Sequence, residues 1–116
     1  MTGLQARLRA DLLNARKARD TTATTVLRST LSAIANAEAL PVTETALATD
    51  GPIAGAAIGV GATEASRRDL SDEDIRSIIA AEQAERRAAA SDMEAHGAGD
   101  RAEQLRAEAE LLATYL

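Results

Sequence analysis

The amino-acid sequence predicts an all-α fold of two antiparallel helical hairpins, about four helices in all. The hairpins are expected to pack as a small bundle, joined by a long loop that contains glycine and proline. Alanine, the best helix former, contributes 28 of the 116 residues, whereas Leu, Ile and Val together contribute 22. Apolar residues recur at helical spacing in four segments, and both prolines lie between the second and third. The length fits a single domain over residues 1–116.

The first hairpin is predicted over residues 4–39. Three leucines recur at every fourth position from Leu4, which is typical of one buried helix face. Asp20 is expected to cap the second helix, because its side chain can accept a hydrogen bond from a backbone N–H of the first turn. Only two or three residues separate the helices, so the second should fold back on the first. Pro41 is expected to end the pair, because the residue before a proline is disfavoured in helical geometry.

A long loop is predicted over residues 40–70, which hold both prolines and most of the glycines. Its stretch "GPIAGAAIGVGATEASRR" raises the question of a phosphate-binding loop. A P-loop would end in Gly-Lys-Ser/Thr, a dinucleotide fingerprint would stand between a strand and a helix, and neither pattern is present. We therefore interpret residues 42–66 as slack between the hairpins. Within it, "PIAGAAIGVG" is expected to lie partly extended on the bundle, with free disorder as the alternative.

The second hairpin is predicted over residues 71–115. In "LSDED", Ser71 is the expected N-cap and Asp74 stands three residues on, which is a variant of the capping box. Gly97 is expected to end the third helix, as glycines commonly do. The fourth helix should run to about residue 115, with Leu105, Leu112 and Leu116 on its buried face.

Charge is distributed unevenly along the chain. Residues 1–37 carry a balance of +4 and residues 38–116 a balance of −9. A basic end of this kind favours contact with a polyanion or with an acidic partner, although attraction between the two halves of one fold would explain it equally well. The residues predicted to contact RNA or a partner are Arg7, Arg16, Lys17 and Arg19.

Four polar residues interrupt or adjoin the apolar faces of the second and third helices. Glu82 stands four residues before an arginine, in the favourable order for an ion pair. We interpret these residues as a polar clamp between the hairpins, in which Glu82 bonds one or both arginines; a recognition surface is the alternative. The members of this predicted clamp are Arg28, Asn36, Glu82 and Arg86.

The sequence gives no indication of an active site, a metal site or a cofactor. It contains no cysteine, and its one histidine, His96, precedes a helix-ending glycine, where a capping role is expected. The acidic run that begins at Asp69 lacks the alternating ligands of a calcium loop. There is no signal peptide and no long apolar segment, so a cytoplasmic protein that does not cross a membrane is expected.

Three stretches of the chain resemble a known family. Two lie in the first half, "LRADLLNARKARD" and "TVLRSTLSAIANAE", and one lies in the second half, "RRDLSDEDIRSIIAAEQAERRAAASDMEAHGAGDRAEQLRAEAELLATYL". Together they resemble the YqeY-like (GatB/YqeY) proteins, relatives of the helical tail of the tRNA-dependent amidotransferase subunit GatB. The chain looks like a short form without the second helical domain of longer members.

The resemblance implies an all-helical fold and a link to glutamine-dependent amidation of aminoacyl-tRNA, a carbon–nitrogen ligase activity. Within that link the chain is expected to be a non-catalytic accessory module that binds tRNA or a protein of the amidation or translation machinery. Two alternatives stay open: a structural interaction protein, such as a homodimer with no role in tRNA binding, and an enzyme that acts only within a complex.

Overall fold

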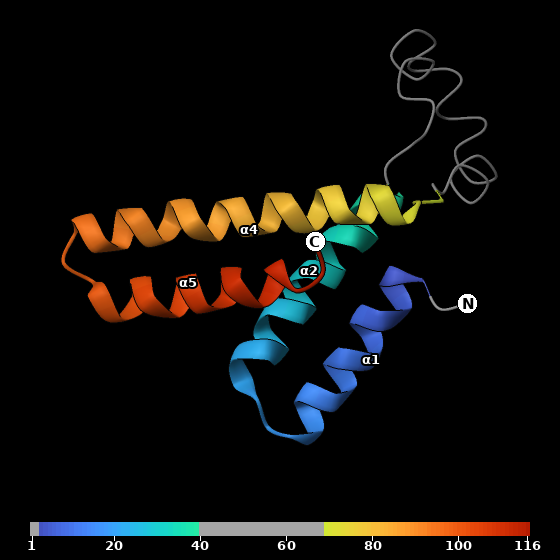
Figure 1. Ribbon diagram of the computed structural model, residues 1–116, viewed down its shortest axis with the longest axis horizontal. Helices are drawn as coiled ribbons and strands as arrows, with labels where there is room; N and C mark the ends of the chain where they lie inside the picture. The colour runs from blue at the N-terminus through green and yellow to red at the C-terminus, as the bar shows by residue number, and fades with distance from the viewer. Residues whose placement is uncertain (1–2, 40–68) are drawn as a thin grey trace, which may run out of the picture. The chain divides into compact units, whose positions relative to one another are not determined.

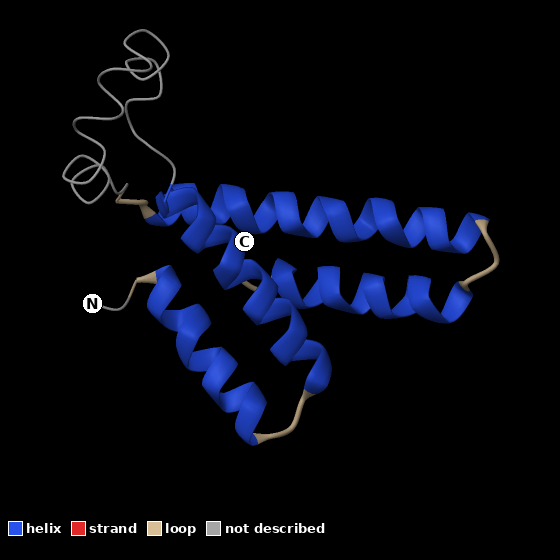
Figure 2. Ribbon diagram, turned by 180° about the vertical axis from the view of Figure 1, so that it is seen from behind, coloured by secondary structure: helices blue, strands red, loops and turns tan. Residues whose placement is uncertain are grey.

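The computed structural model describes residues 3–39 and 69–116, and this part of the chain consists of helices and short connections without a strand (Figures 1 and 2). The expected all-α fold is confirmed. The predicted slack loop at residues 42–66 lies outside the described residues. The helices are α1 (Leu4–Lys17), α2 (Thr21–Ala39), α4 (Asp72–Ala95) and α5 (Gly99–Ala113).

The turn between α1 and α2 is built from three residues. After Ala18, Arg19 has a positive φ of 59°, which is the left-handed conformation that glycine most often supplies at a helix end. The N–H of Asp20 donates to the Ala15 carbonyl at 2.9 Å, and its Oδ1 accepts from the N–H of Ala23 at 3.0 Å. Asp20 therefore caps α2, as its sequence position predicts, and its N–H also bonds the last turn of α1.

The start of α4 is fixed by a reciprocal pair of side-chain hydrogen bonds. Ser71 Oγ accepts from the N–H of Asp74 at 3.0 Å, and Asp74 Oδ2 accepts from the N–H of Ser71 at 3.0 Å. This is the capping box that the sequence indicates. The helix ends at Ala95, and Gly97 follows with a φ of 82°, so the chain reverses and α5 runs back along α4 (Figure 1).

The last residues of the chain depart from the prediction. α5 ends at Ala113, and Leu116 is 51% exposed, so its placement on the buried helix face is wrong. The reason is the change of winding in the final turn. The N–H groups of Thr114 and Tyr115 bond carbonyls three residues back, not four, which tightens the turn. As a result Tyr115, with 7% exposure, occupies the buried position.

Residues 3–34 and 71–116 form one unit, and all four helices contribute to its core. Seven large apolar side chains in it are almost completely inaccessible to solvent, and each contributes about 1.5–3 kcal/mol by its burial. Towards the α4–α5 turn the core narrows to Ala90, Ala102 and Leu105. The seven are Leu8, Val26, Leu27, Ile34, Ile75, Ile79 and Leu112.

Candidate functional site

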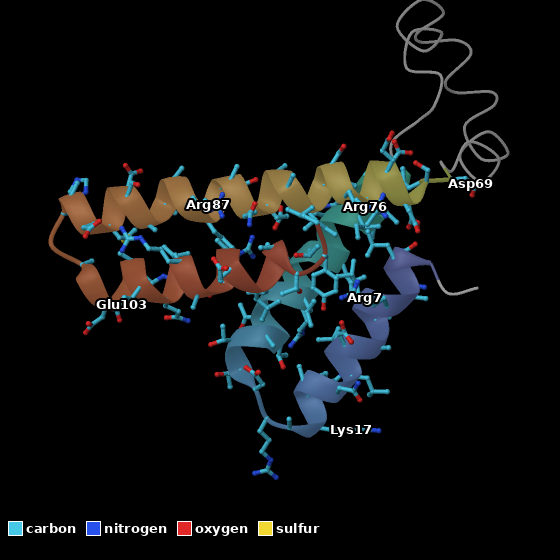
Figure 3. The ribbon with its side chains drawn as sticks, in the orientation of Figure 1. Arg7, Lys17, Asp69, Arg76, Arg87 and Glu103 are labelled. Atoms are coloured by element: carbon cyan, nitrogen blue, oxygen red, sulfur yellow. The ribbon has the colours of Figure 1, made fainter. Side chains whose placement is uncertain are left out.

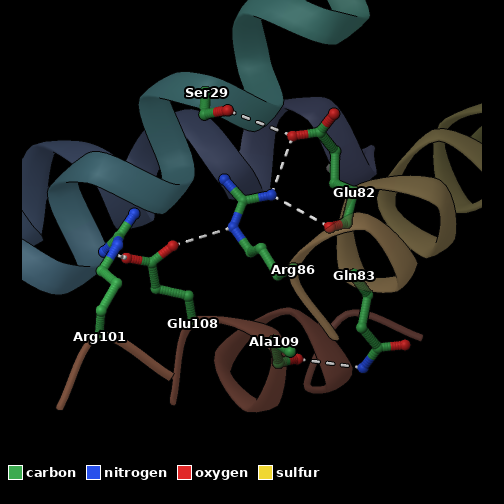
Figure 4. Close-up of polar contacts among 7 residues, drawn as sticks. All are labelled: Ser29, Glu82, Gln83, Arg86, Arg101, Glu108 and Ala109. Carbon is green, nitrogen blue, oxygen red and sulfur yellow. Dashed lines mark hydrogen bonds and ion pairs between the residues drawn. The ribbon is translucent and has the colours of Figure 1, made fainter. Parts of the chain in front are cut away.

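A polar network lies inside the helical unit, centred on Arg86 of α4 (Figure 4). Its Nε donates to Glu108 Oε1 at 3.1 Å, and its Nη1 donates both to Glu82 Oε1 at 3.0 Å and to the Glu82 carbonyl at 3.1 Å. The side chains of Arg86, Glu82 and Glu108 are 11%, 15% and 4% exposed. Two carboxylates thus share one buried guanidinium, which offsets much of the cost of removing these charges from water.

Three more residues extend this network. Ser29 on α2 donates from Oγ to Glu82 Oε1 at 3.2 Å, and Arg101 Nη1 lies 3.8 Å from Glu108 Oε2. Gln83, one residue after Glu82 and also buried, donates from Nε2 to the backbone carbonyl of Ala109 at 3.0 Å. The network therefore joins α4 both to α2 and to α5.

Of the four residues of the predicted clamp, two are paired with each other and two are exposed to solvent. Glu82 and Arg86 form the expected ion pair within α4. Arg28 is exposed, and the hydrogen bond from α2 to Glu82 comes from its neighbour Ser29. Asn36 is exposed near the end of α2.

Glu108 is a member of the polar network that was not predicted from the sequence. It is only 3% exposed as a whole residue, and it supplies the second carboxylate of the network. A signal was available, because Leu105, Glu108, Ala109 and Leu112 recur at i, i+3, i+4 and i+7, which places the carboxylate within the apolar stripe of α5.

Arg7, one of the four predicted contact residues, has partners inside the molecule. Its guanidinium carbon lies 4.7 Å from the centre of the Tyr115 ring, and its Nη2 donates to the Thr114 carbonyl at 3.5 Å. Figure 3 shows Arg7 on α1 directed towards the end of α5. A cation over an aromatic face is attracted by the ring's quadrupole, so Arg7 fastens the last residues of the chain to α1.

Tyr115 makes a second contact with α1. Its hydroxyl donates to Asp11 Oδ2 at 2.5 Å. Burial, the hydrogen bond to Asp11 and the negative charge of Asp11 raise the pKa of the Tyr115 hydroxyl well above its ordinary value, and Arg7 opposes this rise. The hydroxyl is therefore a protonated donor near neutral pH, and its role is to join two helices.

The other three predicted contact residues lie at the carboxyl end of α1. Arg16, Lys17 and Arg19 are all exposed, and Figure 3 shows Lys17 extending away from the helix. Arg16 and Arg19 line a shallow depression together with three hydroxyl-bearing residues of α2, Thr21, Thr24 and Thr25. Within the described ranges, neither guanidinium forms an ion pair with a carboxylate. We define this group of five residues as the corner surface.

A second depression lies between α4 and α5. It is lined by Arg87, Ser91, Arg106 and Glu110, together with Ala109. Arg106 Nη2 is paired with Glu94 Oε1 at 2.5 Å. This depression is lined by charges of both signs, so it has less positive charge to offer an anion than the corner surface.

In the part of the chain that the structure describes, no group of three His, Asp or Glu side chains could hold a metal ion. His96 is exposed at the end of α4, where its Nδ1 lies 2.7 Å from the Asp92 carbonyl oxygen. That position fits the capping role expected from the sequence. In residues 3–39 and 69–116, no helix is both long and apolar enough to span a bilayer.

Comparison of the chain with models of protein families, with curated proteins and with solved structures finds no match.

Proposed function

We propose that this protein is a small, non-catalytic helical module that binds structured RNA, in the manner of an accessory module of the YqeY-like type. The RNA would be tRNA, and the setting would be glutamine-dependent amidation or a related step of translation in the cytoplasm. The family assignment rests on the sequence resemblance, whereas the binding role is supported by the charge distribution of the molecule.

The supporting observation is the cluster of cations at the end of the first hairpin. On α4 and α5, Arg86, Arg101 and Arg106 form ion pairs with carboxylates, whereas Arg76 and Arg87 form none with the described residues. On α1 and the turn that follows it, Arg16, Lys17 and Arg19 form none with the described residues. Unpaired exposed cations attract phosphate groups, and each phosphate that they neutralise releases counterions.

The aromatic content decides which kind of RNA fits. Proteins that bind single strands use exposed aromatic rings as stacking platforms. The only aromatic residue here is Tyr115, which is 7% exposed and engaged by Arg7 and Asp11. The protein is therefore suited to the phosphate backbone of a folded RNA, which is recognised largely by shape and charge.

Fluorescence anisotropy of labelled, unmodified tRNA tests this function. We expect binding at low salt that weakens steeply as salt is raised, and weaker binding to an unstructured oligonucleotide of equal length. The test variant carries both Arg16→Glu and Lys17→Glu, and this charge reversal should abolish the binding. Absence of tRNA binding at low salt, or binding that this charge reversal leaves unchanged, would refute the proposal.

One observation favours a second candidate function, a protein-binding module or homodimer. Leu13 of α1 is 52% exposed, and Met93 and Leu116 are 37% and 51% exposed. Large apolar side chains of this kind often lie in interfaces when they are contiguous. Sedimentation equilibrium of the wild type and of Leu13→Ser distinguishes this candidate: a dimer that dissociates on substitution, without salt dependence, would favour it over RNA binding.

A further inference from the structure

We propose that the corner surface is a binding site for a backbone phosphate of duplex RNA, with the guanidinium groups of Arg16 and Arg19 as its cationic ligands. This inference rests on the proposed function and assigns it a location. It selects one region of the molecule from all the exposed basic positions of α1 and α2.

The first argument is the chemistry that the depression brings together. Arg16 and Arg19 line it together with Thr21, Thr24 and Thr25. Guanidinium groups bind phosphate oxygens through paired N–H donors, and threonine hydroxyls commonly donate to the same oxygens. Arg16 precedes the turn and the threonines follow it, so the turn brings these residues to one surface.

The second argument is the backbone of Arg19. Its φ of 59° places it in the left-handed region, where a residue with a Cβ is strained and glycine is not. Glycine would serve the turn better than arginine. The presence of arginine at this position therefore has no explanation in the geometry of the turn, whereas a role of its guanidinium in binding an anion accounts for it.

The third argument concerns the one acidic side chain of the turn. Asp20 follows Arg19 directly and would repel a phosphate. Its Oδ1, however, accepts the hydrogen bond from the N–H of Ala23 at 3.0 Å, which holds this carboxylate at the start of α2. Arg16, Lys17 and Arg19 outnumber it, so the turn keeps a positive balance.

The strained backbone supplies an informative variant, Arg19→Gly. It deletes the guanidinium but places the residue preferred at a left-handed position, so the protein should fold with unchanged or higher thermal stability. Arg16→Ala is the second variant. Arg76→Ala is the matched control, because Arg76 is an exposed arginine on α4 outside the corner surface.

The probe is a labelled RNA hairpin with a fully paired stem, titrated at several salt concentrations. We expect Arg19→Gly and Arg16→Ala each to raise Kd by about fivefold to tenfold and to flatten the slope of log K against log salt by about one, as the loss of a single phosphate contact requires. Arg76→Ala should change both quantities much less. In NMR spectra, backbone amides of residues 16–25 should shift on titration with the hairpin.

The possible failures are distinguishable. If the wild type does not bind the hairpin or tRNA, the proposed function itself is wrong. If the wild type binds but Arg19→Gly and Arg16→Ala behave like Arg76→Ala, RNA binding stands and the corner surface is not the site. Equal binding of the wild type to an unstructured strand would overturn the assignment to duplex phosphates.

Discussion

The Nε of Arg86 and the Oε1 of Glu108 lie 3.1 Å apart, while the two side chains are only 11% and 4% exposed. A buried pair of this kind is not strong evidence of stabilisation, since both charges lose their hydration. Its consequence appears when one partner is removed. Arg86 alone faces two carboxylates, Glu82 and Glu108, so the network depends on it more than on either acid.

We therefore predict that Arg86→Met lowers the free energy of unfolding by about 3 kcal/mol, because the buried Glu108 then keeps only Arg101, at 3.8 Å, and Glu82 keeps only the hydroxyl of Ser29. Glu82→Gln should cost less, about 1–2 kcal/mol, because Arg86 keeps its bond to Glu108. Urea denaturation of each variant measures both values.

The double variant Arg86→Met with Glu108→Gln is the control for this prediction. It removes both charges of the Arg86–Glu108 pair, so its loss should be clearly smaller than the sum of the losses of Arg86→Met and Glu108→Gln measured singly. Additive losses below about 0.5 kcal/mol each would contradict the prediction, because they would show that these side chains are solvated.

Asp72 caps a helix to which it does not belong. Its Oδ1 accepts from the N–H of Leu4 at 3.2 Å, whereas Gly3, at the N-cap position of α1, provides no side-chain cap. We predict that Asp72→Ala destabilises the protein by about 1 kcal/mol more than Glu73→Ala does. Glu73 is the matched control, because it is an exposed carboxylate in the same first turn of α4. Equal thermal stability of the two variants would show that this cap contributes nothing.

Thr30 is the one described residue with a buried side-chain polar atom that lacks a hydrogen-bond partner. Its Oγ1 is inaccessible, and the residue is 0% exposed on α2. An unsatisfied buried hydroxyl costs free energy, and valine has nearly the same shape. Thr30→Val should therefore raise the free energy of unfolding by about 1 kcal/mol, whereas Thr25→Val, at an exposed position, should change it by less than about 0.5 kcal/mol. A destabilised Thr30→Val variant would contradict this view of the site.

Local signals explain why the helices could be predicted from the sequence. Asp20, Ser71 with Asp74, and Gly97 fix helix ends through bonds and conformations that involve only a few neighbouring residues. The end of α5 lacked such a signal, and Leu116 was accordingly misplaced. Local chemistry made the helix boundaries predictable, and the helical periodicity of apolar residues made most of the buried helix faces predictable.

The polar network was harder to predict because it depends on how the helices are rotated against one another. Successive helical residues point about 100° apart, so Ser29 can reach Glu82 where Arg28 is exposed to solvent. The role of Arg7 depends on tertiary structure in the same way: its ring partner, Tyr115, is near the opposite end of the chain. The charge pattern alone assigns Arg7 and Arg16 to one contact surface, although Arg7 packs on Tyr115 and Arg16 is exposed.

The Tyr115 hydroxyl makes the stability of the protein depend on pH in the alkaline range. Its pKa is raised in the folded state by burial and by Asp11, while in the unfolded chain it should lie near the ordinary value of about 10. Below that value both states hold the proton, and the full contribution to stability is present. Above it the unfolded chain loses the proton first, so the free energy of unfolding falls as pH rises, by up to about 1.4 kcal/mol per pH unit until the folded-state pKa is reached.

Few other side chains titrate at alkaline pH, because Tyr115 is the only tyrosine, Lys17 is the only lysine and cysteine is absent. The effect of Tyr115 can therefore be measured. We expect the free energy of unfolding from urea titrations to decline from about pH 9.5 upwards, where the tyrosine of the unfolded chain begins to ionise. Tyr115→Phe should be less stable at pH 8 by about 1–2 kcal/mol, having lost the bond to Asp11, and should lack most of the decline. Phenolate absorbance should appear in the folded protein only at the onset of unfolding. A normal titration near pH 10 without loss of structure would mean that the hydroxyl is not held between α1 and the end of the chain.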